Sequence, residues 1–187
     1  MEIETIGQLL VNLARVSIFD RLHNTNTLQK DEFLEKLPSF TKSAATFVTL
    51  SLDGKLRGCI GTLVPHTSLY NDLTANAVKA AFEDPRFEPL TVEEFDKVKV
   101  EISLISPIVE MKYNSFSDLR EKIKPNIHGV ILKLDAHQAT FLPQVWEDLP
   151  DFDVFFYHLY KKANLDIEEQ VTAPQIFVYT VEKIIEQ

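Results

Sequence analysis

The sequence predicts an α+β fold, with about six mostly antiparallel strands flanked by five or six helices. Several short segments alternate apolar and polar residues, a pattern typical of half-buried strands. Two pairs of these segments flank turn sequences and therefore predict hairpins. Segments with helical spacing of apolar residues lie between them. Because strands adjacent in the sequence are expected to be antiparallel, this order favours α+β over a doubly wound parallel sheet.

Two helices are expected at the start of the chain. Residues 4–22 have apolar side chains at helical spacing. The apolar stripe consists of Ile6, Leu9, Leu10, Leu13 and Val16. The last turn departs from that stripe at Ile18 and Phe19, so either it is buried on a second side or the helix ends early. Residues 29–36 predict a short second helix before Pro38.

A hairpin is predicted where residues 45–52 and 55–63 flank Asp53-Gly54. The length of its loop decides which face each side chain occupies. A two-residue loop would place Val48 opposite Cys59 and mix apolar with charged side chains on one face. A three-residue loop with the glycine left-handed keeps the pattern consistent, and it is the register that we predict.

The three-residue register separates the two faces of this hairpin. Its expected core face consists of Val48, Leu50, Leu56 and Ile60. Arg57, Cys59 and Gly61 then share the opposite face, with Phe47 opposite Cys59.

The remaining elements follow in order along the chain. A helix over about 68–83, capped by Thr67 or Ser68, stops at Asp84-Pro85. The further expected segments are a strand near 97–106, a short helix near 115–123, a second hairpin over about 128–142, a helix capped by Asp151 and a closing strand over 175–182.

The length and composition predict one cytoplasmic domain spanning residues 1–187. A chain of 187 residues suits a single domain. Its one cysteine excludes an intramolecular disulfide and fits a reducing compartment. The N-terminus carries acids where a signal peptide would carry bases. No apolar run approaches the ~20 residues of a membrane helix, so no membrane association is expected.

The charge argues against bulk nucleic-acid binding. The formal net charge of −9 repels a phosphate backbone. A local basic patch could still bind one nucleotide. The bases in the relevant stretch are Lys55, Arg57, Lys79 and Arg86.

The best candidate functional site is the segment Leu56–Gly61, in which two of the five glycines flank the lone cysteine. Glycine inside a strand often marks close approach by a ligand or by another backbone. The Arg57 guanidinium, two residues away, could favour the thiolate and make Cys59 a nucleophile. Alternatively, Cys59 is a small buried residue that packs near Phe47. The candidate ligand-binding residues are Arg57, Gly58, Gly61, Asn76 and Arg86.

Three other polar residues are open to two interpretations. Asn76, on the core side of its helix, either fixes the backbone of the glycine-containing strand or faces a ligand. Arg86 either locks its loop through an ion pair or contacts an anion. Glu101 is expected to face solvent or pair with a lysine, with a catalytic acid as the weaker alternative.

The sequence lacks the common motifs for binding cofactors and metals. The sequence has no phosphate loop, dinucleotide-binding glycine fingerprint or serine elbow. The five histidines lack metal-ligand spacing, and one cysteine makes a zinc site improbable. No cofactor and no metal are therefore expected.

Six blocks of sequence stand out across nearly the whole chain: Leu56–Leu63, Asn76–Leu90, Val100–Ser103, Gly129-Val130, Ala139–Trp146 and Tyr179–Val181. In these blocks and in their order, the chain resembles the AMMECR-type domain family, the A component of the AmmeMemoRadiSam system. The resemblance implies two β3α2-type halves and one barrel-like sheet. It also implies Memo-like and radical-SAM proteins as partners in a shared pathway, and it names no reaction.

Two kinds of function remain open. The chain is either an enzyme or enzyme subunit that handles a small molecule or nucleotide through Cys59 and Arg57, or a non-catalytic adaptor or peptide-binding module. The single thiol, the arginine and the glycines motivate the first. The lack of base, metal and cofactor motifs motivates the second.

Overall fold

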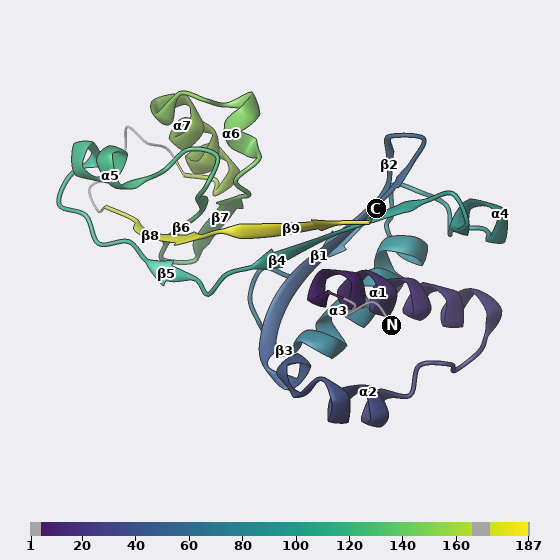
Figure 1. The fold of residues 1–187 in the computed structure, drawn as a ribbon. Coiled ribbons are helices and arrows are strands. Elements are labelled where there is room, and N and C mark those ends of the chain that lie inside the picture. Colours follow the sequence, from purple (N-terminus) through teal and green to yellow (C-terminus); the bar gives the residue numbers. More distant parts are fainter. Residues whose placement is uncertain (1–4, 166–172, 187) are drawn as a thin grey trace. The chain divides into compact units, whose positions relative to one another are not determined.

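A computed structural model describes residues 5–165 and 173–186 and confirms the α+β class. The chain forms two compact units, which are coloured by sequence in Figure 1. Unit 1 comprises Met1–Ile105 and Glu182–Gln187, and unit 2 comprises Ser106–Val181. Each unit has its own hydrophobic core. The assignment of residues 1–187 to a single domain stays a prediction.

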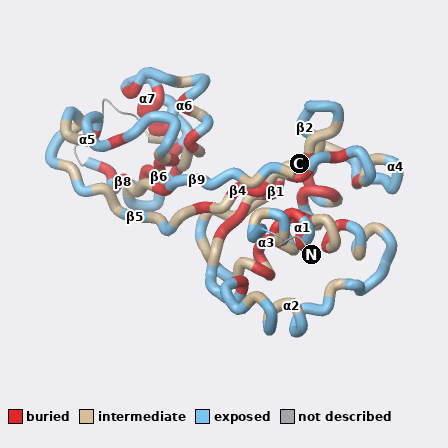
Figure 2. The backbone as a smooth tube through the Cα atoms, viewed as in Figure 1, coloured by how far each residue is buried: buried red, intermediate tan, exposed pale blue. Residues whose placement is uncertain are grey.

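Unit 1 packs helices against one face of a sheet whose strand order is β2-β1-β4-β9, with β3 beside β1. The strands are β1 (Ser43–Leu52), β2 (Lys55–Gly61), β3 (Thr67–Ser68), β4 (Lys99–Ile105) and β9 (Val181–Ile185). The helices are α1 (Ile6–His23), α2 (Lys30–Lys36), α3 (Leu69–Phe82) and α4 (Val92–Phe95), with a 3₁₀ turn at Pro38–Thr41. Buried backbone runs along α1, α3 and the central strands, as Figure 2 shows.

Helix α1 is buried on two sides, because it contacts both α3 and β4. Its buried residues are Leu10, Val11, Leu13, Ala14, Ser17 and Ile18. The predicted stripe is therefore partly wrong: Ile6 is 65% exposed, and Ile18 is fully buried. The helix does not end early. Asn24 closes it in the left-handed conformation, with φ of 53°.

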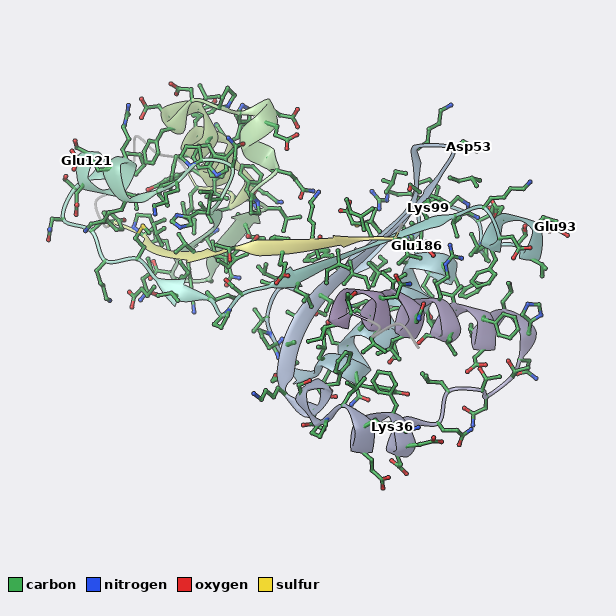
Figure 3. All side chains as sticks on the ribbon, in the orientation of Figure 1. Lys36, Asp53, Glu93, Lys99, Glu121 and Glu186 are labelled. Carbon is green, nitrogen blue, oxygen red and sulfur yellow. The ribbon has the colours of Figure 1, made fainter. Side chains whose placement is uncertain are left out.

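The C-terminal residues tie the last strand to the first helix. The Arg15 guanidinium donates to both carboxylate oxygens of Glu186, at 2.6 and 2.8 Å. The backbone N–H of Val100 donates to the same carboxylate at 2.9 Å. Figure 3 labels Glu186 at the end of β9, near Lys99 at the start of β4. Residues far apart in the sequence thus fix one edge of the sheet.

The first hairpin has a two-residue loop, so the predicted three-residue loop is wrong. Asp53 and Gly54 both have positive φ, 53° and 75°, which is the geometry of a type I′ turn. A β-bulge at Arg57 then shifts the register by one residue. Beyond the bulge, Thr49 pairs with Cys59.

The bulge, which we did not predict, keeps the apolar side chains of β1 and of the second half of β2 on one face of the hairpin. Val48 lies opposite Ile60, and Leu50 lies opposite Gly58. Val48 and Leu50 are both fully buried. Leu56, which was expected on this core face, is instead 45% exposed. The extra residue in β2 therefore offsets the shorter turn.

Both glycines of β2 are required by contacts within the chain. A Cβ on Gly58 would lie 2.1 Å from the carbonyl oxygen of Ala80, in helix α3. A Cβ on Gly61 would lie 2.2 Å from the ring of Phe47, its cross-strand partner. The first glycine lets a helix approach the strand, and the second makes room for an aromatic ring.

Unit 2 has a four-stranded sheet in the order β5-β8-β6-β7. Its elements are β5 (Val109–Glu110), α5 (Phe116–Lys122), β6 (Gly129–Leu134), β7 (His137–Phe141), α6 (Val145–Asp148), α7 (Phe152–Lys162) and β8 (Gln175–Tyr179). Trp146 stacks on Phe155 at 3.6 Å and is fully buried in the core. A Cβ on Gly129 would lie 2.3 Å from the ring of Tyr179, its cross-strand partner.

The two units repeat one topology of hairpin, helix and strand. In unit 1 the third strand, β4, pairs with the first strand of the hairpin, β1. In unit 2, β8 pairs with β6 in the same way. The described strands thus form two antiparallel sheets, and the expectation of one barrel-like sheet is corrected. The estimate of six strands was low because β3, β5 and β9 are short or lie near the chain end.

We expect Gly58→Ala to destabilise the protein by about 2–4 kcal/mol, because the added methyl group meets a backbone oxygen that cannot rotate away. The matched control is Gly54→Asn. Nothing lies within 4 Å of the added Cβ, and asparagine tolerates positive φ better than most residues, so only a backbone cost of about 1 kcal/mol is expected, smaller than that of Gly58→Ala. Urea unfolding measures both. A Gly58→Ala protein with the wild-type midpoint and slope contradicts the contact.

Candidate functional site

Cys59 lies half-buried on β2, with its side chain on the sheet face opposite α3. The hydroxyl of Thr49, its cross-strand partner, donates a hydrogen bond to Sγ at 3.3 Å. The backbone N–H of Cys59 donates to the Asp84 carboxylate at 2.8 Å. Strand β2 is at the end of the sheet order, so this N–H has no strand to pair with. The loop after α3 therefore protects the sheet edge at Cys59.

Asp84 and Arg86 act together as a substitute for a neighbouring strand. Asp84 is 4% exposed and accepts hydrogen bonds from Arg86 Nε and Nη2 at 2.9 and 2.7 Å. Arg86 Nη2 also donates to the carbonyl of Cys59 at 3.3 Å. The Arg86 hydrogen bond holds the pKa of Asp84 well below its usual range. The pair thus satisfies both the N–H and the C=O of Cys59.

Arg86 is a cation held against the backbone of Cys59. Its pKa is raised by the hydrogen bond and charge of Asp84. The Arg86 side chain is 54% exposed. The structure therefore supports a loop-locking ion pair for Arg86 and leaves part of the guanidinium open to solvent.

The Arg57 guanidinium is directed to the loop after α3. Its Nε and Nη2 donate to the two carboxylate oxygens of Glu94, each at 2.8 Å. Nη2 also donates to the Glu88 carbonyl at 2.9 Å. The hydrogen bond from Arg57 lowers the pKa of Glu94 to about 2. Among the described residues these are its hydrogen-bond partners, and none is Cys59. Arg57 thus clamps the loop that covers the edge of β2.

Asn76 belongs to a buried polar cluster on the helix side of the sheet. Its side-chain amide donates to the Thr46 carbonyl at 3.0 Å and to Asp72 at 3.0 Å. Asp72 also accepts from the backbone N–H of Thr46 at 2.7 Å and from the Thr62 hydroxyl at 2.5 Å. The cluster fixes the backbone of β1, the neighbour of the glycine-containing strand. It lies on the opposite sheet face from Cys59.

A row of four polar side chains crosses the sheet face that carries Cys59. Thr49 pairs directly with Cys59 on one side and with Glu101 on the other. Lys183 on β9 forms an ion pair with Glu101 at 3.3 Å. Directly opposite side chains on neighbouring strands have Cβ atoms about 5 Å apart. We call Cys59, Thr49, Glu101 and Lys183 the polar row.

The polar row combines residues that the sequence pattern did not connect. The lysine pairing expected for Glu101 is confirmed. Thr49 was missed, because the predicted register placed it opposite Arg57. Glu94 and Asp84 were missed as partners of β2. The sequence Thr91-x-x-Glu94, a capping box in the structure, could have located the start of α4 but not the arginine that its glutamate binds.

Within residues 5–165 and 173–186, no group of three or more His, Cys, Asp or Glu side chains is placed to hold a metal ion. The helices of the same residues are all too short or too polar to cross a bilayer.

One protein family matches the chain across both units. The AMMECR1 family model matches residues 11–184. Protein NEQ441 of Nanoarchaeum equitans is 39% identical over 137 residues, covering 73% of this chain and 74% of that protein. Protein MJ0810 of Methanocaldococcus jannaschii is 37% identical over 163 residues, with 85% and 79% coverage.

A solved structure agrees with the fold. The crystal structure of uncharacterized protein PH0010 from Pyrococcus horikoshii superposes with a TM-score of 0.79 at 29% sequence identity. The match covers 97% of this chain and 91% of that one.

We expect Glu94→Gln to destabilise the protein by about 1–2 kcal/mol at neutral pH, because Arg57 loses a charged partner. The folded pKa of Glu94 is about 2 and its ordinary value is 4.5, so the ion pair stabilises fully above pH 4.5. That stabilisation is lost as the pH falls towards 2.

The measurement is urea unfolding of wild type and variant from pH 7 to pH 2. The difference between them should shrink steadily below pH 4.5. Glu88→Gln is the matched control, because it keeps the carbonyl that Arg57 uses and removes an exposed carboxylate from the same loop. A difference between wild type and Glu94→Gln that does not depend on pH contradicts the ion pair.

Proposed function

The chain belongs to the AMMECR1 family, and we propose that it binds a small polar molecule on the polar row, with Cys59 as the reactive group. The observation that carries this proposal is the direct cross-strand pairing of a thiol, a hydroxyl and a carboxylate on one sheet face, with an ammonium ion-paired to the carboxylate. These groups offer a nucleophile together with hydrogen-bond donors and acceptors, which is the minimum that orients a small substrate.

In this proposal the catalytic role belongs to Cys59. Arg86, which is bound to the Cys59 carbonyl, is the cation of the site, and its exposed guanidinium contacts an anionic group of the ligand. Arg57, Gly58, Gly61 and Asn76 act indirectly, since their contacts hold β2, α3 and the covering loop in place.

The proposed context is a modification pathway in the cytoplasm. The resemblance to AmmeMemoRadiSam system proteins supports a Memo-like protein and a radical-SAM protein as partners. The chain has a single cysteine and therefore lacks the cysteine set that holds an iron–sulfur cluster. The radical chemistry would belong to the partner, and this chain would bind or transfer the small molecule, which includes a nucleotide as one candidate.

We expect native Cys59 to react with iodoacetamide at neutral pH, and Arg86→Gln to slow this reaction about three- to tenfold through loss of the nearby positive charge. Cys59 is the only cysteine, so labelling reports on this site alone. Arg86→Lys is the matched control, because it keeps a cation at this position, and it should retain most of the rate. A thiol that reacts only after unfolding in denaturant contradicts the proposal.

The alternative is a non-catalytic adaptor or peptide-binding module. One observation favours it: Arg57, Asn76 and both glycines of the motif are occupied by contacts within the chain. An adaptor needs a rigid surface and no reactive thiol.

Co-expression with the Memo-like and radical-SAM proteins separates the two functions. The adaptor hypothesis predicts that wild type and Cys59→Ser are retained equally well on an affinity resin that carries either partner. Capture of neither form, in any combination of the three proteins, would remove the adaptor hypothesis. Retention of both forms, together with loss of pathway product in Cys59→Ser alone, supports the reactive thiol.

A further inference from the structure

A groove lies on the helix side of unit 1, away from the polar row. It is a groove of about 530 Å³ between the second half of α1, the segment after it and α3. Ligand cavities typically span about 300–1,000 Å³. Because α3 packs on the sheet face opposite Cys59, the groove is separated from the polar row by the sheet.

Asp20 builds one wall of the groove. Its carboxylate accepts hydrogen bonds from the Thr25 hydroxyl at 2.7 Å, the Thr27 hydroxyl at 2.7 Å and the backbone N–H of Leu28 at 3.1 Å. Burial raises the pKa of Asp20, but these hydrogen bonds and that of the Thr27 N–H outweigh it and lower the pKa to about 2. The acceptor sites of Asp20 are thus filled within the chain, and the residue shapes the wall.

Tyr70 carries a hydroxyl group that has no hydrogen-bond partner among the described residues. The residue is only 5% exposed, and it lines the groove. Its hydroxyl makes no hydrogen bond to any residue that the structure describes. Within the same residues, every fully enclosed side-chain nitrogen or oxygen has a partner, so the Tyr70 oxygen is not fully enclosed, and the residue lines this groove. Burial and the charges of Asp20 and Asp31 raise the pKa of Tyr70, which keeps the phenol protonated and able to donate.

Two lysines supply positive charge along the same groove. The Lys30 ammonium lies 5.4 Å from the centre of the Tyr70 ring and donates one hydrogen bond, to the Asn71 amide oxygen at 2.9 Å. Lys79 lines the far end, about 14 Å along α3 from Tyr70. Neither lysine forms an ion pair with a carboxylate of the described chain. Acids lie at both ends of the groove: Glu83 at the Lys79 end, and Asp20 and Asp31 near Tyr70. The Tyr70 end is the better anion site because the Asp20 carboxylate is covered by hydrogen bonds from the chain and because two donors, the Tyr70 hydroxyl and the Lys30 ammonium, lie there.

We infer that this groove binds a small organic anion with an apolar body. The Tyr70 hydroxyl and the Lys30 ammonium hold the anionic group, a carboxylate or a phosphate. The apolar body lies along Ala75 and Val78 of α3, beneath Leu28. Lys79 contacts a second polar group at the far end. This site is independent of the polar row and of Cys59.

Isothermal titration calorimetry with simple probes tests the inference. Phenyl phosphate and phenylacetate carry an apolar ring with an anionic group of either kind. Inorganic phosphate carries the anion alone, and benzyl alcohol carries the ring alone. At least one of the two ring-bearing anions should bind with one-to-one stoichiometry, more tightly than phosphate or benzyl alcohol. The one that binds identifies the preferred anion. Lack of saturable binding by both at millimolar concentration overturns the inference.

Matched variants locate the binding. Tyr70→Phe removes only a hydroxyl that makes no hydrogen bond to the described residues, so the thermal midpoint should stay unchanged while binding weakens about five- to tenfold. Lys30→Gln should weaken it by a similar factor, and more strongly at low salt. Lys55→Gln, which removes an exposed ammonium at the end of β2, should have no effect.

Cys59→Ser separates this inference from the proposed function. Its binding of the probe should equal that of the wild type, whatever the labelling experiments show for the thiol. Unchanged binding in Tyr70→Phe, or loss of binding in Cys59→Ser, places the probe outside the groove and overturns the inference.

Discussion

The close approach of helix α3 to strand β2 sets the geometry of unit 1. The carbonyl of Ala80 lies where a side chain on residue 58 would begin, so only glycine permits this spacing. Once the helix is this near, the chain that leaves it passes along the open edge of β2. Asp84 then reaches the backbone N–H of Cys59, and Arg86 reaches its carbonyl. Earlier along the same helix, Asp72 and Asn76 reach the backbone of β1. One short contact therefore positions both polar networks around the hairpin.

The sheet divides the central motif among three environments. Gly58 and Ile60 face the helical core, Cys59 faces the opposite side, and Arg57 sits at the bulge and binds the covering loop. Consecutive residues of this segment therefore contact different parts of unit 1. The guanidinium that binds the Cys59 backbone comes from Arg86, 27 residues further along the chain. Proximity in the sequence was a poor guide to electrostatic proximity here, because β-strand neighbours point to opposite faces and a bulge redirects one of them.

Local patterns were sufficient to predict most elements of the fold. The apolar stripe of α3, the alternation in β4 and the turn at Asp53-Gly54 all identify real elements. The bulge was not predictable, since it resolves a conflict between the preferred turn and the apolar pattern, and either solution fits the residues. The partners of Arg57 were also not predictable. Ion pairs between distant segments depend on how a loop returns to the sheet, and no local pattern encodes that return.

The order of the strands along the chain has a consequence for folding. Strand β5 follows β4 in the chain yet completes the sheet of unit 2, while β9 follows β8 and completes the sheet of unit 1. Helix α1 is tied through Arg15 to Glu186, which directly follows β9. Unit 1 therefore cannot complete its sheet from residues 5–105 alone. Without residues 181–186 the edge of β4 would be unpaired and the Arg15 guanidinium would lack its carboxylate, so the folding of unit 1 depends on a segment that the whole of unit 2 separates from it in the sequence.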